Sequence, residues 1–119
     1  MKDEIGKAIS AHGMWKTRLK SAVDAGQSEF KVDTVKQDNQ CDFGKWLYGT
    51  GIPAATKVTE NYKRCKDLHA KFHLAAANVL FLAVTGKKAE AQKALAVGSD
   101  FAKISSELTR AMMEWQAKS

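Results

Sequence analysis

The chain has 119 residues, 45% of them hydrophobic, which is enough for one domain with a real core. Nineteen basic and thirteen acidic side chains give a formal net charge of +6, but they are interleaved and leave no long basic tract, which argues against nucleic-acid binding. No apolar run reaches the length of a membrane span, and the charged start Met1–Glu4 is not followed by a signal-peptide core. We therefore expect a soluble, cytoplasmic protein without membrane insertion.

The first predicted element is a long helix over residues 2–25, since apolar side chains recur there every three or four residues. Gly26 is a suitable C-terminal stop. His12 falls in the middle of the apolar stripe, so its side chain is expected to point inward. A lone inward histidine is usually held by a hydrogen bond. All three histidines of this chain fall on inward positions, however, which favours a role as metal ligands.

Residues 27–40 are polar and irregular, and we interpret them as an extended connection of the kind that is often functional. A short helix is predicted to follow, capped by Asp38 or Asn39, with Cys41 in its first turn. Amide groups and the helix dipole lower the pKa of a thiol at that position, which suits a metal-binding thiolate. The alternative is that Cys41 is a small buried apolar residue.

The remainder of the short helix is expected to anchor it in the core. Its apolar side chains are Phe43, Trp46 and Leu47. Gly44 is expected to let a neighbouring helix approach closely. The glycines at 49 and 51 end the element.

Two more long helices are predicted after Pro53. The first runs from Pro53 to about Thr85, and it carries His69 and His73 one turn apart, so that both imidazoles can reach one ion. The last spans about Lys88 to Gln116, with Gly98 as its weak point. Its apolar seam repeats in a heptad-like pattern. The seam consists of Ala94, Val97, Phe101, Ile104, Leu108, Ala111 and Trp115.

These elements predict an all-α, four-helix-bundle-like fold, with three long helices and one short helix that carries the cysteine. We expect a single zinc-binding helical bundle domain over residues 1–119. Bundles of this kind commonly hold metals on side chains that project inward from facing helices.

One sulfur and three nitrogens are available for a tetrahedral zinc site. They belong to His12, Cys41, His69 and His73. Four protein ligands would close the shell and leave no position for a substrate water, which argues against a zinc-dependent hydrolase. Ala70 also stands where a hydrolytic His-Glu-x-x-His motif has its glutamate. A zinc ion that only holds the bundle together stays open as an alternative.

The second cysteine, Cys65, lies one turn before His69 on the same stripe. In an intracellular chain we expect both cysteines to be free or metal-bound rather than paired. We interpret Cys65 as a small core residue. The alternative is a resolving thiol for an oxidised Cys41, which requires the two sulfurs to come within disulfide reach.

A spaced pattern links the histidines to the cysteine: it reads His12-x-x-Trp15, then Cys41-x-Phe43-Gly44-x-Trp46, then His69-x-x-x-His73. Twenty-five residues separate the first block from the second, and twenty-two separate the second from the third. This pattern resembles the bacterial chemoreceptor zinc-binding domain family. The resemblance implies a helical bundle that holds one Zn²⁺ ion through those three histidines and Cys41.

The resemblance also implies a sensory or regulatory role rather than an enzyme, and no catalytic residue is assigned. Members of the family occur attached to chemoreceptors or diguanylate cyclases, and some stand alone. They are associated with sensing zinc, and in some cases hypochlorous acid through the zinc-bound cysteine, in chemotaxis or cyclic-di-GMP control. The apolar seam of the last helix and the dimeric state of such receptors and cyclases predict a homodimer. No output domain is visible, so the chain is interpreted as a stand-alone protein or a fragment of a longer receptor.

Overall fold

The computed structural model describes residues 2–28, 30–39 and 41–118, and these contain eight α-helices and no strand. This confirms the predicted all-α fold class. The helices are α1 (Lys2–Gly13), α2 (Trp15–Ala25), α3 (Val32–Lys36), α4 (Asp42–Tyr48), α5 (Ala54–Lys57), α6 (Glu60–Val84), α7 (Lys88–Leu95) and α8 (Asp100–Ala117). None of these described helices is long and apolar enough to cross a membrane.

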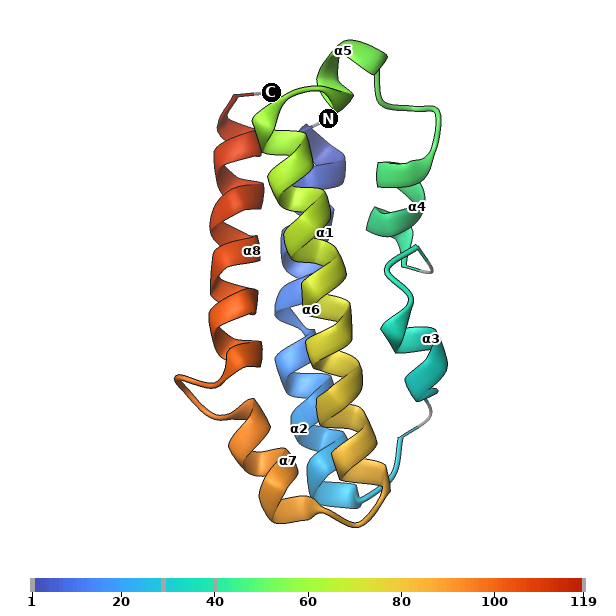
Figure 1. Ribbon diagram of the computed structural model, residues 1–119, viewed down its shortest axis with the longest axis vertical. Helices are drawn as coiled ribbons and strands as arrows, with labels where there is room; N and C mark the ends of the chain where they lie inside the picture. The colour runs from blue at the N-terminus through green and yellow to red at the C-terminus, as the bar shows by residue number, and fades with distance from the viewer. Residues whose placement is uncertain (1, 29, 40, 119) are drawn as a thin grey trace.

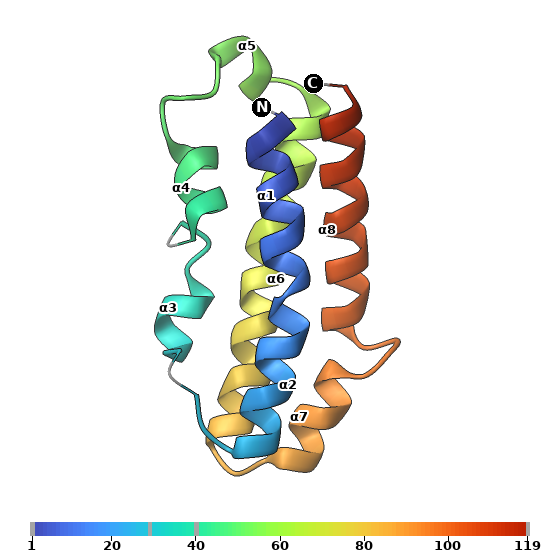
Figure 2. The same ribbon diagram turned by 180° about the vertical axis from the view of Figure 1, so that it is seen from behind.

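The long helices form an elongated bundle around α6 (Figure 1). One side of α6 is covered by α1 and α2, which run end to end, and another by α8 and α7 (Figures 1 and 2). The short helices α3 and α4 lie along the remaining side. The amide of Gln116 donates to the carbonyl of Lys2 at 3.2 Å, so α1 begins where α8 ends.

The predicted first helix is divided at Met14, but its two parts keep one direction (Figure 2). Met14 retains helical dihedral angles, φ −73° and ψ −18°, and its amide donates to the carbonyl of Ser10 at 3.3 Å. The predicted stop is confirmed: Gly26 has φ 71°, and its amide donates to the carbonyl of Ala22. Residues 2–25 therefore supply one continuous side of the bundle.

The connection predicted over residues 27–40 is not wholly irregular, because α3 occupies its middle and buries Val35. The predicted caps of the next helix, Asp38 and Asn39, are wrong. Cys41 itself is the N-cap of α4, and its Sγ accepts a hydrogen bond from the Gly44 amide at 3.3 Å. A sulfur can take the capping role that oxygen usually plays, so the cysteine lies just before the first turn rather than within it.

The prediction that Gly44 lets a neighbouring helix approach closely is wrong. Gly44 instead faces the stretch of chain that leads into its own helix. A Cβ built on Gly44 would lie 1.8 Å from the carbonyl oxygen of Asp38, a distance that no side chain tolerates. The glycine therefore allows the preceding backbone to fold across α4 and to present Cys41 to the bundle.

The two helices predicted after Pro53 are each divided in two. Pro53 caps the short α5, and α6 begins afresh where the Thr59 hydroxyl accepts from the Tyr62 amide. Residues 96–99 interrupt the last helix, and Gly98 adopts φ 87° there. Val97 is 93% exposed, so it does not belong to the predicted seam. The rest of α8 keeps its apolar side inward, with Phe101, Leu108, Ala111 and Trp115 buried.

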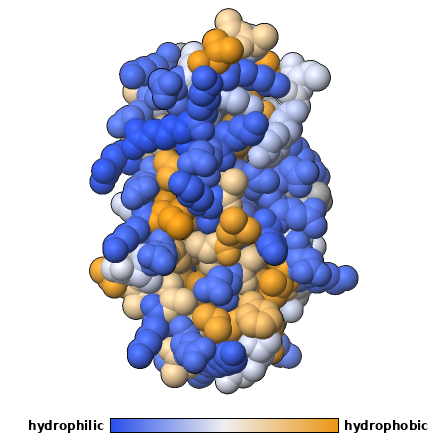
Figure 3. All heavy atoms as spheres, viewed as in Figure 1, coloured by the Kyte–Doolittle hydropathy of each residue, from blue (hydrophilic) through white to orange (hydrophobic). Residues whose placement is uncertain are grey.

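Hydrophilic side chains cover most of the upper half of the face seen in Figure 1, and apolar surface gathers over its lower half (Figure 3). On α6 the exposed large apolar side chains are Leu74, Phe81 and Val84. The seam of α8 is used within the bundle, against α1 and α6, so these α6 side chains are a different apolar surface from the predicted one.

Candidate metal centre

Four potential ligands meet inside the bundle. They are His12 of α1, Cys41 at the start of α4, and His69 and His73 of α6. One ligand atom from each lies within 4.8 Å of all the others. The three histidines are buried, with 5%, 0% and 2% of their surface exposed in chain order, and Cys41 is half-buried. The inward orientation predicted for the histidines is therefore confirmed.

The spacing of the donor atoms matches a tetrahedral zinc site. Cys41 Sγ lies 3.3 Å from His69 Nε2 and 3.5 Å from His73 Nε2, and the two Nε2 atoms are 3.0 Å apart. Bond lengths of about 2.3 Å to sulfur and 2.0–2.1 Å to nitrogen place neighbouring ligands of a tetrahedral ion roughly 3.3–3.6 Å apart. These three donors therefore need only a few tenths of an ångström of adjustment to hold zinc, and the ligand atom of His12 lies within 4.8 Å of each of them.

Backbone carbonyls orient two of the imidazoles. His12 Nδ1 lies 2.8 Å from the carbonyl oxygen of Ala8, and His73 Nδ1 lies 2.8 Å from that of Val35. A carbonyl only accepts, so each Nδ1 carries the proton and each Nε2 keeps its lone pair. Such outer-shell hydrogen bonds fix the tautomer of metal-ligating histidines. His12 Nε2 has no hydrogen-bond partner among the described residues, so its lone pair is available to a metal ion.

His69 is held differently. Its Nε2 faces the sulfur and His73, while its Nδ1 is buried with no partner among the described residues. Ring contacts confine it instead, because its centroid lies 5.1 Å from that of Phe43 and 4.9 Å from that of His12.

Burial keeps the imidazoles neutral. It lowers the pKa of His12 to about 4, against the opposing effect of the Ala8 hydrogen bond, and that of His69 to about 2. Burial also lowers the pKa of His73. Neutral imidazole is the form that binds metal, so near neutral pH the histidines need lose no proton to act as ligands.

The thiol behaves differently from the prediction. Burial raises the pKa of Cys41, and this outweighs the hydrogen bonds from backbone amides, led by that of Gly44, which lower it. The amides at the start of α4 thus lower the pKa of the metal-free thiol as predicted, but burial makes the net shift a rise. One thiol and three neutral imidazoles still form a donor set that suits zinc, provided that the ion displaces the thiol proton.

Aromatic residues of the sequence motif surround the cluster without joining it. The Phe43 ring lies 5.7 Å from that of His12 and 5.7 Å from that of Trp46, which packs in turn on Trp115. Trp15 packs on Phe30 at 5.2 Å. Phe43 and buried Phe72, whose ring lies 5.3 Å from that of His12, line the site with apolar surface.

Cys65 stands apart from this group as a free, fully buried thiol. Burial raises its pKa to about 12, which makes it inert near neutral pH. Both properties agree with the interpretation as a core residue.

The sequence did not predict the roles of the Ala8 and Val35 carbonyls, because every residue has a backbone oxygen whatever its type. It also missed Trp115, whose part in the contacts around α4 depends on how α8 packs.

A family model described as the chemoreceptor zinc-binding domain matches residues 12–80, a span that covers more than half of the chain and holds all four clustered residues. The helices α7 and α8 lie beyond it. No curated protein and no solved structure matches significantly. On the family match, the chain belongs to the chemoreceptor zinc-binding domain family.

Proposed function

We propose that this protein is a zinc-binding sensory or regulatory module of bacterial signalling, whose ion is held by one sulfur and three imidazole nitrogens. The ligands are His12, Cys41, His69 and His73. The observation that carries the proposal is the convergence of four donors from distant segments within 4.8 Å of one another, three of them 3.0–3.5 Å apart, close to the spacing in a tetrahedral zinc site. Membership of a zinc-binding family supports the choice of metal.

A zinc ion here would tie together three parts of the bundle. It would link α1, the start of α4 and α6, while the Ala8 and Val35 carbonyls hold two imidazoles in place. Four protein ligands complete a tetrahedral shell, so we assign no catalytic residue and do not favour a zinc-dependent hydrolase. A purely structural zinc is the second candidate, supported by the same links between distant segments.

The proposed stimulus is zinc itself or an oxidant such as hypochlorous acid that acts on Cys41. Cys41 is the half-buried member of the group, which supports its role as the labile ligand. Oxidation of its sulfur would replace a good zinc donor by a poorer one. Loss of that bond would free α4 to move, and Phe43 and Trp46 would carry the movement into the core.

The proposal extends to partners and to the chain as a whole. We propose a cytoplasmic homodimer that acts with or within a chemoreceptor or a diguanylate cyclase, as one domain over residues 1–119. Residues 1, 29, 40 and 119 of that domain lie outside the described residues. The exposed apolar side chains of α6 support self-association, and sedimentation that finds only a 13.1 kDa species would contradict it.

The metal content of the purified protein tests the central assignment. The wild type should carry one zinc ion per chain, and Cys41→Ser should lose most of it. Cys65→Ser, which changes the other thiol, should keep zinc at the wild-type level. An equal zinc content in the wild type and in Cys41→Ser would show that Cys41 is not a ligand. To separate a sensor from a structural site, zinc should exchange reversibly with a chelator while the chain stays folded.

A further inference from the structure

One side of the ligand cluster opens into a cavity. The cavity has a volume of about 560 Å³ and lies between α1, α2 and α4; we call it the α1–α4 cleft. Both His12 and Cys41 line it. The histidines are almost fully buried whereas Cys41 is half-buried, so the cleft meets the cluster at its most accessible donor.

The walls of the α1–α4 cleft combine aromatic rings with both signs of charge. Its aromatic side chains are Trp15, Phe43 and Trp46. Two cations, Lys7 and Arg18, and two carboxylates, Glu4 and Asp42, complete the charged lining. Stacking restrains the Arg18 guanidinium, which lies 5.3 Å from the centroid of the Trp15 ring.

Balanced charges favour a ligand that carries both signs. A carboxylate would be attracted to Arg18 and Lys7, and an ammonium group to Glu4 and Asp42, with the apolar part of the ligand against the rings. A plain anion or cation would meet one pair of like charges. The volume of the cleft lies within the range of small-molecule sites, roughly 300–1,000 Å³.

We propose that the α1–α4 cleft binds a zwitterionic, sulfur-containing amino acid or short peptide and brings its sulfur to Cys41. The disulfide form of such a ligand would modify the protein. The Cys41 thiolate attacks one ligand sulfur, and a new sulfur–sulfur bond forms as the ligand's own bond breaks. In the metal-free protein the departing thiolate takes up the proton that Cys41 released, and in the zinc-loaded protein it takes one from water. Cys41 is oxidised, the departing sulfur is reduced, and no other oxidant is consumed.

The consequence for zinc rests on the proposed function. A Cys41 sulfur engaged in a mixed disulfide is no longer a thiolate ligand, so the modification would release the metal and report the redox state of small thiols. Recognition of the ligand itself depends only on the cleft and can be measured whether or not zinc is bound.

Three disulfide probes of similar size test the recognition on the full chain. Cystine carries both charges, cystamine lacks the carboxylates, and 3,3′-dithiodipropionate lacks the ammonium groups. Peptide mass spectrometry follows the adduct on Cys41 over time. Arg18→Gln should lower the cystine-to-cystamine rate ratio by about two- to fivefold, the range of a partly exposed ion pair. Lys7→Gln should act in the same direction, and Asp42→Asn should lower the cystine-to-dithiodipropionate ratio.

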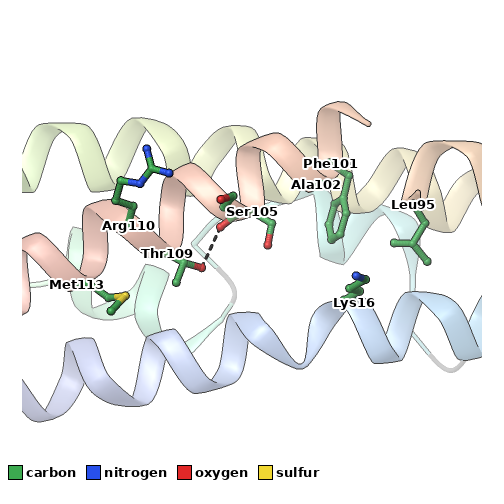
Figure 4. A pocket seen from close by; sticks show the side chains of 9 residues that line it. Lys16, Leu95, Phe101, Ala102, Ser105, Thr109, Arg110 and Met113 are labelled. Carbon is green, nitrogen blue, oxygen red and sulfur yellow. Dashed lines mark hydrogen bonds between the residues drawn. The ribbon is translucent and has the colours of Figure 1, made fainter. Parts of the chain in front are cut away.

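Rate ratios within one variant cancel any change in the reactivity of Cys41. The matched control for the cations is Lys16→Gln, because Lys16 also belongs to α2 but points into a separate cavity of about 440 Å³, toward Phe101 on α8 (Figure 4). The matched control for the carboxylates is Glu107→Gln on α8, which does not line the cleft. Both controls should keep the wild-type ratios.

Unchanged ratios in Arg18→Gln, Lys7→Gln and Asp42→Asn, with helix content retained, would overturn the inference. A zinc titration of the same proteins separates this from the proposed function. Shifted ratios in a chain that binds no zinc would support the cleft and contradict the zinc module. Normal zinc binding with unshifted ratios would contradict the cleft alone.

Discussion

Trp46 on α4 packs against Trp115 on α8, with ring centroids 5.4 Å apart and an interplanar angle of 32°. Trp46 also contacts Phe43, whose ring lies 5.1 Å from that of His69. Aromatic contacts therefore run from the ligand cluster to the last helix, which lies beyond the matched residues 12–80. A movement of α4 would therefore change the packing of α8 through these rings.

Removal of zinc should change the tryptophan emission, because α4 would lose its bond to the cluster and the contact between Trp46 and Trp115 would loosen. Trp46→Phe should abolish most of the change. Trp15→Phe, which alters a tryptophan that packs on Phe30 instead, should preserve it. Emission that stays constant while a chelator removes the zinc would mean that α4 does not move.

Gly44→Ala should destabilise the protein, because the new Cβ would overlap the carbonyl oxygen of Asp38. Overpacking of this kind costs about 1–3 kcal/mol, and relief of the overlap would also displace Cys41 and weaken zinc binding. Gly13→Ala is the control: nothing lies within 4 Å of its Cβ, and an alanine in α1 should stabilise by about 0.5–1 kcal/mol. Urea unfolding and zinc titration measure both effects. Equal stability of the two variants would contradict the close approach of Asp38 to α4.

Zinc binding near neutral pH should release about one proton per ion, which comes from Cys41. Burial raises the pKa of that thiol, so it is protonated before the metal binds, whereas His12 and His69 are already neutral at pKa values of about 4 and 2. The affinity should therefore rise with pH until the pKa of Cys41 is reached. Calorimetry in buffers of different ionisation enthalpy counts the protons. Cys41→Ser should release almost none, and a wild type that releases none would show that the thiol is already ionised.

Much of this centre could be predicted from residue types alone. The three histidines fall on apolar helix stripes, and a stripe determines which side chains face the interior. The breaks at Met14 and between α5 and α6 escaped prediction, since apolar periodicity continues across them. The break at residues 96–99 contains Gly98, the predicted weak point of the last helix, although a full interruption was not predicted.

The environment of Cys41 could not be predicted from the sequence for another reason. Its burial, its capping hydrogen bond with Gly44 and the close approach of Asp38 depend on how distant segments pack. The sign of its pKa shift follows from burial, which local sequence cannot reveal.

Chelation of the zinc should lower the midpoint of thermal unfolding but leave the far-UV helix signal largely intact. The ion stabilises only the folded state, whereas the apolar core of α1, α2, α6 and α8 remains without it. Circular dichroism with and without a chelator measures both quantities. A chain that loses its helix signal on chelation would favour the purely structural zinc.

X-ray absorption at the zinc edge tests the central claim most directly. A site made of His12, Cys41, His69 and His73 predicts four-coordinate zinc with one sulfur at about 2.3 Å and three nitrogens at about 2.0–2.1 Å. Cys41→Ser should remove the sulfur shell, while Cys65→Ser should leave it unchanged. A wild-type spectrum with no sulfur, or with two, would contradict the assignment.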